Sequence, residues 1–481
     1  MRHSYNFDPR DAEDHNWERL YTVRRRDALF AFTIPESQGS AILGRDHLGA
    51  VPLFYRTDSG SVESSTHLAD LVRGNETLNE EGLTTFVALG TPKLVSLFNE
   101  IKVVPHGTVL RVHPSGESEV LYRYTFRRIR HILKSFAWYR DMLDRLLAQA
   151  ARRAVHDSDT VGLYLSGGVD SGLTAQHLVA QGATVHAYTT TPWGAESAEG
   201  KLAKRNAEVT GVHSHTIVPF DTSAYARYAA GLEQYANPCG ATSMLAISCI
   251  ALDTEVRTES HIVFAQNADT ATASVADQSL LYFASYIPTF LRRRVHRLLS
   301  SRSIMDNFVA LRTTGLLMHS AILDRYTRDY SRLEQLTLAG MLFAHSPVDG
   351  DIVIQPTLAR GQRISNLFYD IDVIEFLMGL PLRHRISISS ESKFWVGLKK
   401  RILKSLARGV LPDEVIDRKK GLTVPLHKDV HAREFFEKLP TQIGARTLSL
   451  PQHRFAAHML KLWAQKLPHP PKALLDLYTH P

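Results

Sequence analysis

The sequence predicts an α/β protein with a small β-rich N-terminal domain, then a parallel-sheet domain whose C-terminal part is helical. Short apolar runs broken by Gly, Pro, Ser and Asp fill residues 27–114. A succession of strand, Gly-rich turn, helix and strand fills residues 160–191. Residues 292–480 are mostly helical in pattern, with prolines as breakers.

Length and composition narrow the possible classes of protein. The chain has 481 residues, of which 44% are hydrophobic, so we expect two domains, residues 1–125 and 126–481. The formal charge of +7 is spread along the chain. Diffuse basicity suits an anionic or peptide substrate at least as well as nucleic acid, and a solvated helix surface would give the same pattern, so no nucleic-acid partner is expected.

The number of cysteines and the length of the apolar runs indicate the cellular compartment in which the protein is expected. The two cysteines, Cys239 and Cys249, are too few for a disulfide framework and fit no zinc spacing. No apolar run reaches about 18 residues, and the N-terminus lacks the apolar core of a signal peptide. We therefore expect a cytoplasmic protein that does not bind a membrane.

The first domain is predicted from four short runs that alternate or are wholly apolar. They are DALFAFTI (27–34), SAILGRD (40–46), PLFYR (52–56) and TVLRVHP (108–114). Each is bounded by turn-forming residues, which is typical of strands.

The second domain begins near a helix predicted over residues 134–156, where Leu and Ala recur at helical spacing. A strand follows at TVGLYL (160–165), then the turn SGGVDSG, a helix, and a strand over 183–191. This βαβ unit predicts a parallel sheet with its ligand site at the carboxyl ends of the strands.

The turn SGGVDS has the chemistry of a phosphate site. Gly167 and Gly168 let backbone N–H groups approach an anion, and Ser166 and Ser171 add hydroxyl donors at a helix N-terminus. A carboxylate beside phosphate needs a cation between them, so we interpret Asp170 as a Mg²⁺ ligand. The alternative is a tight loop with no ligand.

SGGVDS lacks the spacing of a Walker loop and resembles the pyrophosphate-binding loop of the N-type ATP pyrophosphatases, which implies ATP as the cofactor. Further segments resemble the asparagine synthetase superfamily, whose members include β-lactam synthetases, carbapenam synthetases and lasso-peptide macrolactam cyclases. These segments are GRDHLGAVPLFY (44–55), the closing hairpin over 98–112, Glu199, Ala203, Ala207 and Gly211 at helical spacing, and residues 370–381 and 400–425. The resemblance is uneven between 270 and 365, and it implies a reduced glutaminase-like (Ntn-type) domain before an ATP-pyrophosphatase domain.

Glutamine hydrolysis is not expected. Glutamine-dependent members of the superfamily use the thiol of an N-terminal Cys, but residue 2 is Arg2 and no Cys precedes Cys239. GRDHLG begins already at Gly44, so the first half of a glutaminase domain is expected to be missing. The first domain is then a remnant or a platform for substrate.

After the missing N-terminal Cys, a second departure from the superfamily pattern lies in HIVFAQNADTATAS (261–274). The resemblance places the second Mg²⁺ ligand at Asp269, with Ala265 and Asn267 where glycines are usual. A lone Asp after a strand is otherwise a helix N-cap. Gln266 stands where β-lactam and carbapenam synthetases carry a Tyr that helps deprotonate the amine, and a carboxamide cannot act as a base.

Two lysines about twenty residues apart neutralise the developing charge in the superfamily. Lys400 and Lys420 match these places, with Lys419 as an alternative to Lys420. Exposed surface lysines would give the same pattern. Leu165, Thr189 and Phe264, on strand ends that flank the loops, are expected to line the adenine slot, although core residues would give the same pattern. Ala265 is also assigned to the nucleotide site.

These residues imply an ATP-dependent, AMP- and pyrophosphate-forming amide ligase. A small molecule or peptide that carries both a carboxylate and an amine is the expected partner, so ring closure of macrolactam or β-lactam type in natural-product biosynthesis is the leading version. An ammonia-dependent asparagine synthetase remains open, as does a non-catalytic scaffold bound to a partner biosynthetic enzyme. The histidines, such as those of HSH (213–215), form no recognisable metal motif.

Overall fold

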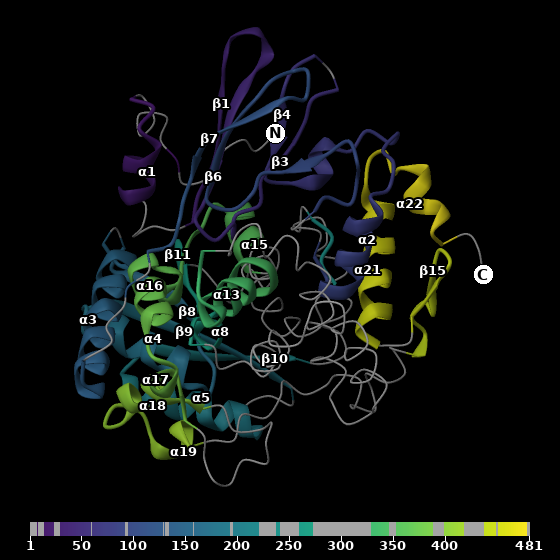
Figure 1. Cartoon of the computed structure of the whole chain (residues 1–481). Coiled ribbons are helices and arrows are strands. Elements are labelled where there is room, and N and C mark those ends of the chain that lie inside the picture. Colours follow the sequence, from purple (N-terminus) through teal and green to yellow (C-terminus); the bar gives the residue numbers. More distant parts are fainter. Residues whose placement is uncertain are drawn as a thin grey trace.

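The structure is a computed structural model, shown in Figure 1. It describes residues 7, 14–23, 29–58, 60–91, 95–127, 129, 134–156, 158–192, 196–220, 237–240, 259–272, 329–345, 353–387, 399–417, 437–448 and 451–478.

The N-terminal part is β-rich, as predicted. Its strands form two antiparallel sheets, one ordered β1-β2-β6-β7 and the other β4-β3-β5. The elements are α1 (Trp17–Val23), β1 (Ala31–Pro35), η3 (Ser37–Gly39), β2 (Ala41–Arg45), β3 (Phe54–Arg56), β4 (Glu63–Ser65), η4 (Leu68–Leu71), α2 (Glu80–Leu89), β5 (Lys102–Val103), β6 (Thr108–Val112) and β7 (Ser118–Arg123).

The prediction of a hairpin over residues 98–112 is wrong. Strand β5 pairs with β3, whereas β6 pairs with β2 and β7, so the two strands of that segment lie in different sheets. The hairpin is formed instead by β6 and β7. Gly116, with a φ of 87°, stands in the turn between them.

The second part is built on a parallel sheet. Its elements are α3 (Phe136–Ala154), β8 (Thr160–Tyr164), α4 (Val169–Ala180), β9 (Thr184–Pro192), α5 (Ala198–Thr210), β10 (Ser214–Phe220), β11 (His261–Val263), α8 (Ala268–Ala271), α13 (Arg332–Ala339), η8 (Gly340–His345), α15 (Gln355–Ala359), β12 (Arg363–Ser365), η10 (Leu367–Tyr369), α16 (Ile371–Gly379), α17 (Leu382–Arg385), β13 (Ile386–Ser387), β14 (Lys399–Lys400), α18 (Arg401–Ala407), α19 (Asp413–Ile416), β15 (Gln442–Ile443), β16 (Arg446–Thr447), α21 (Pro451–Lys466) and α22 (Lys472–Asp476).

The parallel sheet has the order β10-β9-β8-β11-β12, and all four strand pairs are parallel. The predicted βαβ unit β8-α4-β9 is confirmed. Strand β12 was not predicted, because three residues are too few to show a strand period. The chain moves outward from β8 in one direction and then restarts at β11 on the other side, so the switch point lies between β8 and β11.

Side-chain caps explain where several helices begin. Ser135 and Ser197 each accept an N–H of the first turn, of α3 and of α5. Asn79 caps α2 in the same way, and Asp370 caps α16. Gly211 ends α5 with a φ of 71°, a left-handed conformation that favours glycine.

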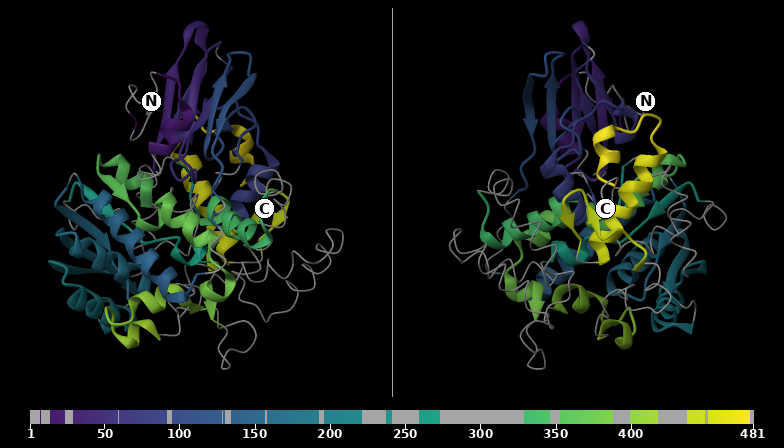
Figure 2. Two further views of the ribbon diagram at one scale, coloured as in Figure 1. Left: turned by 60° about the vertical axis from the view of Figure 1, so that its left-hand side comes forward. Right: turned by 90° about the vertical axis from the view of Figure 1, so that its right-hand side faces the viewer.

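The hydrophobic cores are not divided at residue 125. Helix α21 packs against α2, and Leu460 and Trp463 share a buried cluster with Phe54 and Phe86. Figures 1 and 2 show α21 and α22, in yellow, beside the blue α2. The last described helices therefore pack on the N-terminal part, although the chain order places them in the second domain.

Among the described residues, no helix has the length and apolar character needed to cross a bilayer.

Candidate nucleotide site

The loop after β8 is braced by its own serines. The Ser171 hydroxyl accepts the Ser166 N–H at 3.0 Å and lies 2.8 Å from the Ser166 hydroxyl, which accepts the Gly168 N–H at 3.2 Å. Both hydroxyls, predicted as phosphate donors, are thus engaged within the loop. Gly168 is the N-cap of α4 and offers no side-chain cap, so the first N–H groups of this 12-residue helix have no capping side chain.

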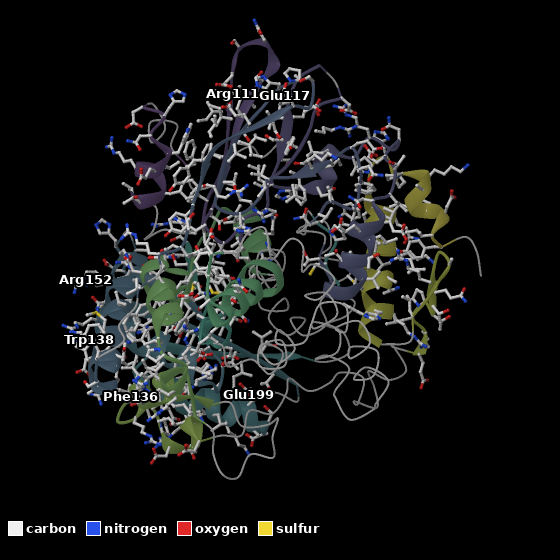
Figure 3. The ribbon with its side chains drawn as sticks, viewed as in Figure 1. Arg111, Glu117, Phe136, Trp138, Arg152 and Glu199 are labelled. Atoms are coloured by element: carbon white, nitrogen blue, oxygen red, sulfur yellow. The ribbon has the colours of Figure 1, made fainter. Side chains whose placement is uncertain are left out.

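Helix α5 supports the same loop with two side chains. Glu199 accepts the Gly167 N–H at 2.8 Å. Asn206 donates through Nδ2 to the carbonyl oxygens of Ser166 and Gly168. The Gly167 N–H, which the sequence assigned to an anion, therefore already donates to a carboxylate. Figure 3 labels Glu199 in the lower part of the molecule, far from Arg111 and Glu117 on the N-terminal hairpin.

The second loop follows β11 and leads into the short helix α8. Asn267 has a φ of 72°, the left-handed region in which asparagine is better tolerated than most residues, so it does here what a glycine would do. Asn267 is also the N-cap of α8, which has no side-chain cap. Asp269 stands in the first turn and is not the N-cap, so the helix-capping alternative for Asp269 is wrong.

Three charged side chains meet between the two loops. Lys400 Nζ contacts Asp170 Oδ2 and Asp269 Oδ1. The three side chains are only 15–22% exposed, so their attraction is weakly screened. The neighbouring ends of β8 and β11 bring the two carboxylates together, as the sequence predicted. Lys400 is the N-cap residue of α18 and lies 230 residues after Asp170 in the chain.

The carboxylates fit a divalent cation. Both lie at one ammonium group, so a single cation can reach both of them. Asp170 Oδ1 is buried and has no hydrogen-bond partner, which is costly unless a ligand completes it. The described residues contain no cluster of three His, Cys, Asp or Glu suited to a metal, so water and phosphate would supply the remaining ligands of Mg²⁺.

Of the residues predicted to line the adenine slot, Leu165 and Phe264 directly follow β8 and β11, whereas Thr189 lies within β9. Leu165, Thr189 and Phe264 are at most 3% exposed, whereas Ala265 is half-buried. The Thr189 hydroxyl donates to the Leu165 carbonyl and contacts Nε2 of His215. Burial, with a contribution from Lys204, lowers the pKa of His215. These three residues are therefore packed in the core, and their contact with a nucleotide stays a prediction.

Of the other two predicted catalytic residues, the structure describes Gln266 but not Lys420. Gln266 is half-buried, and its backbone carbonyl accepts Asn366 Nδ2 at 3.1 Å. Lys420, its alternative Lys419, and GLTVPLH (421–427) lie outside the described residues. The prediction for Lys420 therefore stays a prediction.

Three supporting residues were not assigned to the site from sequence: Glu199, Asn206 and Asn366. Glu199 was noted only for its helical spacing. Asn206 lies seven positions further along α5, two helical turns away, so a polar residue on the buried face of that helix was the available signal. Asn366 follows the missed strand β12, and no pattern pointed to it.

The first domain's motif GRDHLG folds as a closed unit. The Asp46 carboxylate accepts the N–H groups of Leu48, Ala50 and Val51 at 2.8–3.0 Å. Arg45 donates to the carbonyls of Gly49, Val51 and Val104. Every one of these contacts is internal to the domain.

Comparisons with known proteins support the fold described above. The asparagine synthase family model matches residues 142–251 and 367–475, and the glutamine amidotransferase domain model matches residues 17–125. The chain belongs to the asparagine synthetase superfamily. The match of the synthase model includes Asp170 and Lys400 but not Asp269, so the second carboxylate is placed by the structure.

A curated relative is also similar over part of its length. It is "Asparagine synthetase [glutamine-hydrolyzing] 2" of Bacillus subtilis (strain 168), 25% identical over 181 residues. The match covers 34% of this chain and 24% of the relative. Members of the asparagine synthetase superfamily use ATP, usually with Mg²⁺, which suits the loop and the carboxylate pair described above.

Proposed function

We propose that the protein is an ATP-dependent amide-bond ligase that forms AMP and pyrophosphate. It adenylates a substrate carboxylate and lets an amine attack the acyl-adenylate. Glutamine supplies no ammonia in this reaction. The amine belongs to the same substrate, a small molecule or peptide, so the product is a ring of macrolactam or β-lactam type made in natural-product biosynthesis.

The observation that carries this proposal is the meeting of Asp170, Asp269 and Lys400 beside the SGGVDS loop. Two carboxylates and one ammonium have a net charge of −2 + 1 = −1, which favours a further cation at this point. The uncapped start of α4 lies next to it and favours phosphate. A nucleotide phosphate with its divalent cation satisfies both preferences.

Each residue then has a defined task. Asp170 and Asp269 would hold Mg²⁺, which neutralises phosphate charge when bound. The N–H groups at the start of α4 orient the β- and γ-phosphates. Lys400 keeps a positive charge near the α-phosphate, where negative charge develops as the carboxylate attacks and pyrophosphate leaves. Lys420 is proposed to share that task.

Ring closure suits a site without a strong base. No cysteine occurs in residues 1–238, so the sequence in this region offers no thiol for glutamine hydrolysis. Gln266 cannot accept a proton from the amine. When amine and acyl-adenylate belong to one bound molecule, their effective concentration replaces part of the help that a base would give.

Two alternatives have distinct signatures. The name of the Bacillus relative favours an asparagine synthetase, which here would take ammonia directly and act on aspartate. A non-catalytic scaffold, bound to a partner biosynthetic enzyme, was suggested by the altered second loop. The left-handed backbone of Asn267 argues against the scaffold, because the loop keeps the shape that a glycine would give it.

The test is ATP–pyrophosphate exchange with Mg²⁺ across amino acids, diamino acids and peptides encoded near the gene. Exchange that depends on one carboxylate supports the ligase, and AMP formation with a cyclic product identifies ring closure. Exchange with aspartate and product formation only with ammonium salts would instead establish the asparagine synthetase. Failure to bind Mg-ATP in calorimetry would overturn both and leave the scaffold.

A further inference from the structure

The buried face of helix α5 includes a polar side chain, Asn206, that bonds outside its own helix. Ala203, Asn206 and Ala207 of this face are all at most 5% exposed, and Asn206 is completely buried. Alanines pack against the neighbouring helix without any polar partner. Asn206 instead reaches the loop between β8 and α4.

The amide of Asn206 binds both ends of the glycine turn. Its Nδ2 donates to the Ser166 carbonyl at 3.0 Å and to the Gly168 carbonyl at 3.1 Å. Both carbonyl oxygens thus point toward α5. In each planar trans peptide unit the C=O and the following N–H point in opposite directions, so fixing the carbonyls of Ser166 and Gly168 also fixes the directions of the N–H groups of Gly167 and Val169. Asn206 therefore helps to determine the shape of the loop, together with Ser171 and Glu199.

The neighbouring glycine of α4 makes this approach possible. A Cβ atom on Gly172 would lie 3.3 Å from Asn206 Nδ2 and 2.7 Å from Leu411 Cδ1. A side chain at residue 172 would thus press on the amide that holds the loop. The contact between α4 and α5 is close here, and Asn206 fills it.

Packing alone does not account for an asparagine at this position. Asn206 Oδ1 is buried and has no hydrogen-bond partner, a cost that an apolar residue of similar size would not carry. A polar residue kept at a cost in stability is expected where function depends on it. The benefit visible in the structure is the pair of hydrogen bonds to the loop.

We propose that Asn206 is a positioning residue that holds the SGGVDS loop in the conformation that binds the β- and γ-phosphates of ATP. The inference rests on the proposed nucleotide site and adds the residue that shapes it. Asn206 does not touch the nucleotide. Its removal weakens the binding of the β- and γ-phosphates and leaves the binding of the nucleoside and α-phosphate unchanged.

The experiment compares three ligands on the full chain: Mg-ATP, Mg-pyrophosphate and AMP, each by titration calorimetry. In Asn206→Leu, the affinities for Mg-ATP and Mg-pyrophosphate are expected to fall about tenfold or more, since two hydrogen bonds to the loop are lost. AMP lacks the outer phosphates, so its affinity stays within about twofold. In Asn206→Ser, whose side chain is smaller and keeps one donor, the affinities for Mg-ATP and Mg-pyrophosphate are expected to lie between those of the wild type and of Asn206→Leu.

The matched control is Thr210→Val. Thr210 lies one turn further along α5, is buried, and donates its hydroxyl only to carbonyls of its own helix. All three affinities should stay unchanged in this control. Melting temperatures measured in parallel separate lost binding from lost folding, and Asn206→Ser avoids overpacking if Asn206→Leu does not fold.

The outcomes distinguish the two levels of proposal. A wild-type protein that binds AMP and ATP, with Asn206→Leu and Asn206→Ser losing all three ligands equally or none, would overturn the positioning role and leave the ligase intact. A wild-type protein that binds neither Mg-ATP nor Mg-pyrophosphate would overturn the ligase and the positioning role together. A selective loss for the two pyrophosphate-bearing ligands supports both.

Discussion

Two Gly-containing turns each follow a strand and each carry an aspartate, yet they differ in what the aspartate binds. In GRDHLG, Asp46 accepts three N–H groups of its own turn. In SGGVDS, Asp170 faces Lys400 from a distant helix, and its Oδ1 has no hydrogen-bond partner. The Asp46 carboxylate is fully hydrogen-bonded without a ligand, whereas the Asp170 carboxylate is not. Satisfied polar groups indicate a folding unit, and unsatisfied ones indicate a ligand site.

This difference predicts that changes in the first turn affect stability and changes in the second affect activity. The largest effect is expected for Arg45→Met. Arg45 is buried, and its loss leaves three carbonyls without their donor and Asp46 without its nearest positive charge. The cost is about 3–5 kcal/mol of unfolding free energy. Thermal unfolding measures it, while exchange activity per folded molecule should remain at the wild-type level.

The control for the destabilisation by Arg45→Met is the variant Arg111→Met. Arg111 forms its ion pairs with Glu36 and Glu119 near the surface, where such pairs contribute about 0–1 kcal/mol. If Arg45→Met were no more destabilising than Arg111→Met, the closed turn would not be a folding unit.

Asp170→Asn is expected to show the opposite profile. The substitution keeps the shape of the side chain but removes the charge that holds the cation, so ATP–pyrophosphate exchange should fall at least about 100-fold. The melting temperature should change by no more than about 2 °C, because this carboxylate has no backbone partner to lose and Lys400 keeps its contact with Asp269. An unchanged exchange rate would contradict the assignment of Asp170 as a metal ligand. Asp141→Asn, on the exposed side of α3, is the control and should leave both quantities unchanged.

The pH dependence of stability offers a smaller test of the first turn. Burial raises the pKa of Asp46 to about 6, against the opposing effects of Arg45 and the three N–H groups. A raised pKa means that the folded protein binds a proton more tightly than the unfolded chain. The contribution to stability is therefore complete below the unfolded pKa of about 3.9 and is lost as the pH rises through about 6.

Asp46→Asn removes this titration. The stability of the wild type relative to the variant should fall by up to about 1.4 kcal/mol per pH unit between pH 4 and pH 6, and stay level above that. Paired melting curves at pH 4.5, 5.5 and 7.0 measure it. Parallel curves for the two proteins at every pH would show that Asp46 does not titrate in this window.

The sequence predicted the parts of the site that come from local pattern. The βαβ unit and the SGGVDS turn were readable because strand, glycines and helix are contiguous, and the two predicted ligands lie where neighbouring parallel strands end. Asn206 and Glu199 could not be assigned, because their role depends on how closely α5 packs against α4. Strand β12 and the packing of α21 on α2 were missed for a similar reason, since a three-residue strand and a long-range helix contact leave no periodic signal.

The last and smallest expected effect concerns Lys400. In the structure its ammonium contacts both carboxylates, so Mg²⁺ must compete with it for them. In Lys400→Met the two carboxylates lie together without that charge, and Mg²⁺ alone should raise the melting temperature by about 2–4 °C more than in the wild type. Lys404→Met, one turn further along α18, is the control and should respond to Mg²⁺ like the wild type. Equal Mg²⁺ responses in all three proteins would mean that the carboxylates do not share a cation, and the second turn would then be as closed as the first.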